Sequence, residues 1–149
     1  MRKIIVLLVA ATAITALITS AGSASADAGT PVLGAKGFSA GHGYGWGTAH
    51  PRSISNGGVP SGIVYRIGWQ HWGAQRAFGY GKTPIYRPSW GYYGKLGKIV
   101  LRAQRLGRCD GQRAYTRLYF RVVRKPGGPL GTWHPWTTRT GNICRSPWA

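Results

Sequence analysis

Basic and aromatic side chains alternate over residues 98–121, and these residues have the clearest chemistry in the chain. The guanidinium group of Arg presents a planar set of donors that fits phosphate or carboxylate oxygens and stacks on aromatic rings. Bases interleaved with rings are typical of sites for anionic polymers. We therefore predict an anion-binding surface formed by Lys98, Arg102, Arg105, Tyr115, Arg117, Tyr119 and Arg121.

The charge of the whole chain indicates the same kind of partner. The 20 Lys and Arg residues face 2 acidic residues, Asp27 and Asp110, which leaves a formal net charge of +18. Such an excess attracts acidic polymers and surfaces, so we expect a cell-wall polyanion, an anionic surface or a nucleic acid as the partner. The other interpretation is a solvated β face on which Arg and Tyr stack on one another.

Several classes of enzyme lack their reactive groups in this chain. Most glycosidases need two carboxylates beside the scissile bond. A Ser-His-Asp triad would have to use Asp110, and no G-x-S-x-G motif is present. A calcium site needs several oxygen ligands, most of them charged, and this chain has only two carboxylate side chains. The chain also has no P-loop motif for binding phosphates. We expect a binding protein rather than an enzyme, without a metal ion or a cofactor.

The remaining acid–base groups are four histidines: His42, His50, His71 and His134. Two His residues with a Lys or Arg can cleave RNA by general acid–base catalysis, and three can hold zinc. No two of them stand at a recognisable motif spacing, so a His-dependent secreted ribonuclease is the alternative function. A cationic antibacterial protein is another alternative, although the sequence shows no amphipathic helix.

The chain also contains 7 Trp residues. Their rings could form platforms for sugars, but filling a β core that is poor in Leu and Phe is the favoured interpretation. Trp69 and Trp72 lie three residues apart in a predicted strand region. This spacing predicts that they point to opposite faces, with at least one of them in the core.

The elements that must position these residues are predicted to be strands. Residues 98–104 and 114–124 alternate with a period of two around a turn at residues 110–111, which predicts a long hairpin. Residues 41–47 alternate Gly with larger residues, which predicts either an irregular strand whose Gly side lies flat against a neighbour or a loop with exposed rings. Other predicted segments are strands at 63–67, 74–80 and 132–138 and an edge or loop segment at 83–90.

We predict an all-β fold, a single-domain antiparallel sandwich or small barrel with Gly-rich turns and one disulfide. Residues 27–60 are the Gly-rich N-terminal segment, residues 61–149 are the β domain, and 27–149 together have the length of one folded unit. Cys109 and Cys144 are expected to pair, because an even number of cysteines in an oxidising compartment indicates a disulfide.

Residues 1–26 have the pattern of a secretory signal. Arg2 and Lys3 precede an uncharged apolar stretch over residues 4–18, and residues 24–26 read Ala-Ser-Ala. An uncleaved membrane anchor is the alternative, but the stretch is shorter than the roughly 20 residues that span a bilayer. We expect cleavage after Ala26 and a secreted protein without a membrane span in its mature form; the sequence leaves the oligomeric state open.

Short segments spread over the predicted mature chain carry a family resemblance. They are residues 45–52, 60–63, 69–73, 101–103, 106–109 and 114–115, the first of which reads Gly-Trp-Gly-Thr-Ala-His-Pro-Arg. In these segments the chain resembles small exported proteins of actinobacteria of unknown function. The resemblance implies an exported β protein, and it supplies no catalytic residues.

Overall fold

The computed structural model describes residues 29–39, 41–137 and 139–146. The predicted leader, residues 1–26, lies outside these ranges. Within them the regular elements are strands and one turn of 3-10 helix, η1 (Pro60–Gly62), so the all-β prediction is confirmed. The strands are β1 (Val32–Leu33), β2 (Ile54–Ser55), β3 (Ile63–Gln70), β4 (Arg76–Thr83), β5 (Tyr86–Arg87), β6 (Gly91–Tyr92), β7 (Gly97–Cys109), β8 (Gln112–Val122) and β9 (His134–Pro135).

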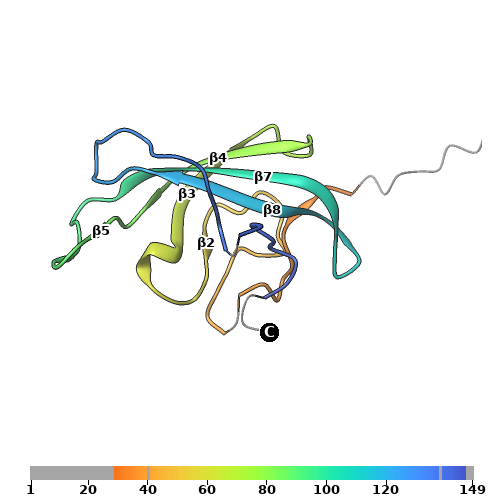
Figure 1. The fold of residues 1–149 in the computed structure, drawn as a ribbon. Helices are drawn as coiled ribbons and strands as arrows, with labels where there is room; N and C mark the ends of the chain where they lie inside the picture. Colours follow the sequence, from red (N-terminus) through yellow and green to blue (C-terminus); the bar gives the residue numbers. More distant parts are fainter. Residues whose placement is uncertain (1–28, 40, 138, 147–149) are drawn as a thin grey trace, which may run out of the picture.

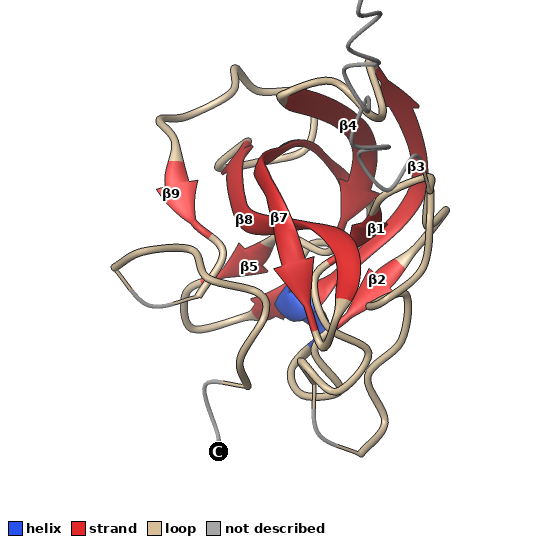
Figure 2. Cartoon of the chain, turned by 90° about the vertical axis from the view of Figure 1, so that its right-hand side faces the viewer, coloured by secondary structure: helices blue, strands red, loops and turns tan. Residues whose placement is uncertain are grey.

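One curled sheet forms the body of the fold and has the shape of half a barrel (Figure 1, Figure 2). Its strand order is β1-β8-β7-β4-β3-β2, and β9 also pairs with β8. Neighbouring strands are antiparallel except β1, which runs parallel to β8. Strands β5 and β6 form a separate two-stranded arm. No helix in the described ranges is long and apolar enough to cross a membrane.

The long hairpin predicted from the period-two pattern is present as β7 and β8. Asp110 and Gly111 form the turn between them, and both have a positive φ, of 50° and 77°. An Asp-Gly pair with two left-handed residues is a type I′ turn, whose twist matches that of the flanking strands. The turn fixes the register in which side chains of β7 and β8 meet across the hairpin.

The core lies on the inner, concave face of the sheet. Leu101, Ala103 and Leu118 are completely buried there. The Gly-rich N-terminal segment and the C-terminal segment lie across this face (Figure 1), and they add residues such as Trp46 and Ile143 to the same cluster. The segment predicted at 27–60 therefore shares one core with the strands that follow it.

The Gly-rich stretch at residues 41–47 combines features of the two interpretations. It is a series of turns with one bridge, between Tyr44 and Ser55, and Tyr44 is exposed, but from Gly43 to Gly47 its glycines lie close against neighbouring residues. Gly45 has a φ of 87°, and a side chain at this position would meet the carbonyl oxygen of Ser53. Trp46, the next residue, is buried, and its indole N–H donates to the carbonyl of Ser55 over 2.8 Å. Glycine thus permits the close backbone approach that places Trp46 in the core.

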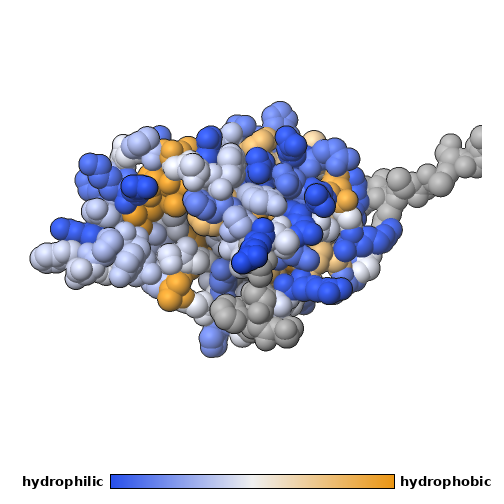
Figure 3. Space-filling view, in the orientation of Figure 1, coloured by the Kyte–Doolittle hydropathy of each residue, from blue (hydrophilic) through white to orange (hydrophobic). Residues whose placement is uncertain are grey.

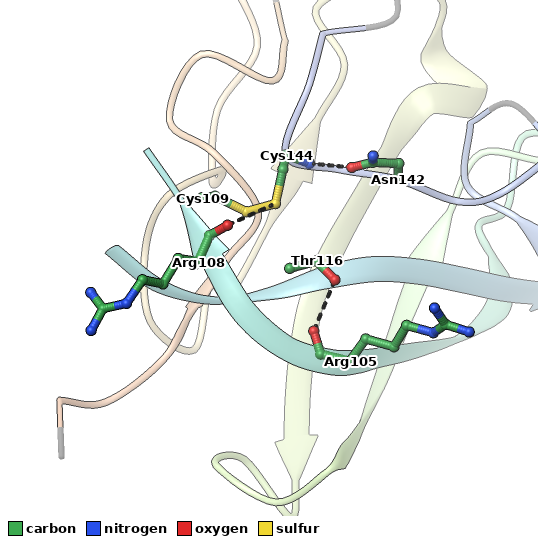
Figure 4. The surroundings of a disulfide bond; sticks show 6 residues. All are labelled: Arg105, Arg108, Cys109, Thr116, Asn142 and Cys144. Carbon is green, nitrogen blue, oxygen red and sulfur yellow. Dashed lines mark hydrogen bonds between the residues drawn. A yellow bond between two sulfur atoms is a disulfide. The ribbon is translucent and has the colours of Figure 1, made fainter. Parts of the chain in front are cut away.

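The predicted disulfide joins Cys109 at the end of β7 to Cys144 in the C-terminal segment, with a Cα–Cα distance of 5.1 Å (Figure 4). Around it, Val32, Ala35 and Ala114 form a small buried cluster. The bond therefore holds the C-terminal segment against the hairpin end where β1 also pairs.

Trp69 and Trp72 lie on the same side of the sheet, so the prediction of opposite faces is wrong. Their ring centroids are 4.7 Å apart in an edge-to-face arrangement, and both rings pack against the core. The prediction assumed one continuous strand, but β3 ends at Gln70. In the turn that follows, His71 has a φ of 56°, and this turn brings Trp72 back over Trp69.

Two other segments differ from the prediction in their ends. The last strand, predicted at 132–138, is shortened to β9, which pairs with Tyr119 and Phe120 of β8. The N–H of Trp136 still donates to the carbonyl of Leu118 over 2.9 Å, but the N–H of Leu118 donates to the carbonyl of Gly141, so the ladder ends there. The segment at 83–90 contains β5, which belongs to the arm rather than to the main sheet.

Candidate anion-binding face

The side chains of β4, β7 and β8 that point away from the core form a continuous surface, here called the outer face. The cross-strand register sets its rows; in one of them Phe78, Arg102 and Tyr119 lie side by side. Six of its residues are bases and three are aromatic, and none is acidic. The outer face comprises Arg76, Phe78, Tyr80, Lys82, Lys98, Val100, Arg102, Gln104, Arg117, Tyr119 and Arg121.

Trp133 lies over two of these bases. The guanidinium carbon of Arg102 is 4.5 Å from the ring centroid of Trp133, and that of Arg121 is 5.1 Å from it. Arg102 also lies over the ring of Tyr119, at 5.1 Å. Stacking of this kind holds the planar guanidinium groups in fixed orientations, so two cations are placed on the sheet before any ligand binds.

The same two bases carry buried donors without an acceptor. The Nε atoms of Arg102 and Arg121 are shielded from solvent, and no hydrogen-bond partner for either lies in the described parts of the chain. A buried donor that makes no hydrogen bond is unfavourable by about 1–3 kcal/mol.

Arg117 and Tyr119 connect the outer face to the C-terminal segment. The Nη1 group of Arg117 donates to the carbonyl of Thr140 over 2.9 Å, and the hydroxyl of Tyr119 donates to the same oxygen over 3.2 Å. Part of the hydrogen-bonding capacity of these two predicted site residues is thus used inside the protein.

Lys98 is exposed and faces Lys82 across β7 and β4.

Tyr115 does not lie on the outer face, and the prediction that it does is wrong. Its side chain is completely buried. Its hydroxyl donates to the carbonyl of Ala74 over 2.7 Å and accepts from the N–H of Gly73 over 2.8 Å. The alternation along β8 places Tyr115 with Tyr119, but the β3–β4 turn closes over this end of β8 and Trp72 packs on the ring at 5.1 Å. Burial raises the pKa of the Tyr115 phenol above its ordinary value.

Arg105 is exposed on β7 near the hairpin end, in a left-handed conformation with a φ of 59°. Its carbonyl accepts a hydrogen bond from the hydroxyl of Thr116 over 2.9 Å. Figure 4 shows that the side chains of Arg105 and Arg108 extend in opposite directions from the strand. These two bases near the hairpin end therefore do not converge on one site.

A cleft of about 470 Å³ opens on the outer face. Four of the residues around it are bases, and its floor is largely apolar. Figure 3 shows a face of the molecule that is mostly hydrophilic, with a hydrophobic patch at the end of the sheet near β5. The cleft is lined by Arg66, Tyr80, Gly81, Lys82, Lys98, Ile99, Val100, Arg121 and Leu130.

A larger cavity of about 600 Å³ lies toward the arm and has a different character. Its lining includes Ile85, Ile99 and Val122, and Arg124 is the one Lys or Arg among the residues that line it. The concentration of positive charge therefore distinguishes the smaller cleft as the place where an anion would bind.

Three residues of this region are missing from the predicted set: Arg66, Lys82 and Trp133. The first two lie on β3 and β4, and only the strand order β3-β4-β7 brings them beside the hairpin. Trp133 reaches the hairpin because the chain returns to β8 at β9. The two Trp residues within residues 132–136 are visible in the sequence, but the long-range pairing of this segment is not.

The histidines lie in separate surroundings. The ring of His50 packs on Trp72 at 4.7 Å, and that of His134 packs on Phe120 at 5.8 Å. Across residues 29–39, 41–137 and 139–146, no three His, Cys, Asp or Glu side chains form a group that could hold a metal ion.

A scan against protein-family models, a search of curated proteins and a search of solved structures found no match for this chain.

Proposed function

We propose that this chain binds an anionic polymer along its outer face. The observation that carries the proposal is the gathering of six bases and three aromatic rings on one side of the sheet, without an acid among them. Guanidinium groups would contact the charged groups of the polymer, and the rings would stack on its flat or apolar parts. Asp110 lies in the β7–β8 turn, apart from these rows.

A β face that is only solvated would explain the residue types on the outer face, but it would not explain two unfavourable features of that face. Two guanidinium groups on this face have buried donors without an acceptor, and Lys98 lies directly opposite Lys82. Like charges that are directly opposite on neighbouring strands destabilise a sheet. A face selected only for solubility has no need of either feature, whereas an anionic partner would offset the repulsion between Lys82 and Lys98.

Export of the chain is part of the proposal. The leader pattern at residues 1–26 and the Cys109–Cys144 disulfide both support it, because disulfides persist in oxidising compartments. The partner would then be an anionic polymer met outside the cytoplasm. N-terminal sequencing of the protein recovered from culture medium tests this part; a chain retained with residues 1–26 intact would contradict it.

Salt dependence of binding tests the proposed function. We expect fluorescently labelled polyphosphate, heparin and a single-stranded oligonucleotide to bind, because all three present closely spaced anionic groups. Release of counterions from several contacts should weaken binding by about tenfold or more between about 50 and 200 mM salt. Fluorescence anisotropy measures this. Affinity that is absent at low salt for all three polymers, or that does not change with salt, would contradict the proposal.

A further inference from the structure

We infer that the cleft on the outer face is a specific site for a phosphate monoester whose phosphate is attached to an apolar or aromatic group. The inference rests on the proposed function, since the cleft belongs to the same face. It goes further in naming one site and one class of ligand. Three structural features around the cleft are unfavourable in the free protein, and each of them involves a base that lines the cleft.

The first feature is a pair of like charges. Lys82 of β4 and Lys98 of β7 are direct partners in the antiparallel register, and both line the cleft. Directly opposed ammonium groups repel each other. A phosphate dianion between them would replace this repulsion with two attractive contacts.

The second feature is a bulge in β3. The register with β4 shifts between Tyr65 and Gly68, so β3 contains one extra residue there. Arg66 lies in this bulge with a φ of 53°, a left-handed conformation that is unfavourable for a residue with a side chain. Bulges change the direction of a side chain and are frequent beside functional sites. Here the bulge places Arg66 at the rim of the cleft.

The third feature is the Nε atom of Arg121, which is buried without a hydrogen-bond partner in the described parts of the chain. Arg121 stacks on Trp133 and also lines the cleft. Its guanidinium group is thus held in place beside the cleft, where its Nη groups, rather than the shielded Nε, would be the donors to a ligand. A tetrahedral phosphate has enough acceptor oxygens to bind Arg121 together with the other bases.

The floor of the cleft indicates what the phosphate is attached to. Val100 is the cross-strand partner of Tyr80, and both line the cleft with Leu130. The opposite neighbour of Tyr80 is Gly68, where nothing lies within 4 Å of the position of a Cβ, so the Tyr80 ring is accessible from that side. A flat or apolar group would cover this floor, whereas inorganic phosphate would leave it in contact with water.

Phenyl phosphate is the probe that tests the inference, in a titration of the ¹⁵N-labelled protein followed by NMR near pH 7.5, where a phosphate monoester is mostly dianionic. We expect saturable shifts of the Arg121 Nε–H and the Val100 amide. Phenyl phosphate should bind about tenfold or more tightly than either inorganic phosphate or phenol, because each of these lacks one of the two contact types. Equal affinity for phenyl phosphate and inorganic phosphate would overturn the inference.

Lys82→Gln should weaken phenyl phosphate binding by about tenfold, since it removes one charged contact. Lys95→Gln, which removes the same charge outside the cleft, is the control and should leave the affinity unchanged. If both variants bind phenyl phosphate as the parent does, the cleft is not the site. Retained polyphosphate binding by the parent in that case would leave the proposed function standing. A parent protein that binds phenyl phosphate but none of the polymers would refute the proposed function alone.

A final comparison identifies the source of the phosphate. If an oligonucleotide with a 5′-phosphate binds more tightly than the same oligonucleotide with a 5′-hydroxyl, the cleft takes the phosphorylated end of a polymer. Equal affinity of the two, with phenyl phosphate still bound, assigns the cleft to free monoesters. If phenyl phosphate causes no saturable shift of the Arg121 Nε–H, the inference is wrong whatever the oligonucleotides do.

Discussion

The guanidinium carbon of Arg102 lies 4.5 Å from the ring centroid of Trp133, and this contact joins the hairpin to the segment that precedes β9. It fixes a cation from the middle of β7 under a ring that is 31 residues away in the sequence. Because Arg121 lies under the same ring, one side chain orients two bases of the outer face. Replacing Trp133 alone therefore measures how much the orientation of these two bases contributes to binding.

Trp133→Leu should weaken binding of an anionic polymer by severalfold and lower the free energy of unfolding by about 1–2 kcal/mol, since two cation–π contacts of about 0.5–1 kcal/mol each are lost. Anisotropy titration and urea unfolding measure the two effects. Trp90→Leu is the matched control: Trp90 is 74% exposed and stacks on Arg87 at 4.9 Å, but it lies on the arm. Equal loss of affinity in both variants would show that Trp133 does not orient the site.

Tyr115→Phe should lower the free energy of unfolding by about 1–3 kcal/mol, because the buried N–H of Gly73 and carbonyl of Ala74 lose their partner. Polymer binding should not change, since Tyr115 is buried. Tyr80→Phe is the control, as Tyr80 is 47% exposed and has no such role in the core. Parent-like stability of Tyr115→Phe in urea would contradict this account of the residue.

Alkaline pH should destabilise the parent protein more than Tyr115→Phe. Burial raises the pKa of Tyr115 above its ordinary value of 10.0 in the folded state. Above about pH 10 the unfolded chain therefore binds fewer protons than the folded one, so stability falls as pH rises, until the folded group also ionises. The difference between the two unfolding free energies, measured from pH 8 to 11, should shrink above pH 10. A constant difference would exclude this linkage.

Replacing Cys109 and Cys144 together by Ser should lower the free energy of unfolding by about 4 kcal/mol in the chain-entropy model, because the bond closes a loop with a sequence separation of 35. Urea unfolding of the variant, and of the parent with and without a reductant, measures the effect. The reduced parent should match the double variant. A loss below about 1 kcal/mol would mean that the closed loop adds little constraint to the unfolded chain.

Gly45→Ala should destabilise the fold by about 2 kcal/mol or more, because the position has a positive φ and the added methyl would meet the carbonyl of Ser53. Gly58→Ala is the control, since nothing lies within 4 Å of a Cβ there and its φ is not in the positive range. Thermal unfolding separates the two. If both variants unfold like the parent, the close packing of the Gly-rich stretch does not matter for stability.

The period-two pattern in the sequence predicts the hairpin and its turn well, because both depend on local interactions. Alternation places Arg102, Tyr119 and Arg121 on the same side of the sheet, and the Asp-Gly pair sets the register between the strands. Alternation fails at Tyr115, where a turn from another part of the chain covers the face that would otherwise meet solvent. Nothing within β8 itself distinguishes Tyr115 from Tyr119.

The cleft could not be predicted from the sequence for a related reason. Arg66 belongs to it through a bulge in β3, and Lys82 belongs to it because β4 lies between β3 and β7. Both facts depend on the strand order, which is set by burial of the whole sheet and not by any one segment. The composition predicts that the partner is anionic, whereas the strand register determines which residues lie together to bind it.

The central claim is that the position of the charges on the outer face, and not the net charge alone, determines polymer binding. Arg102→Gln with Arg121→Gln removes two charges from that face, and Lys36→Gln with Arg52→Gln removes two exposed charges from the segment between β1 and β2. Affinity for polyphosphate at one fixed salt concentration should fall by about tenfold or more in the first variant and by less than about threefold in the second. Equal losses in the two variants, or no loss in the first, would contradict the claim.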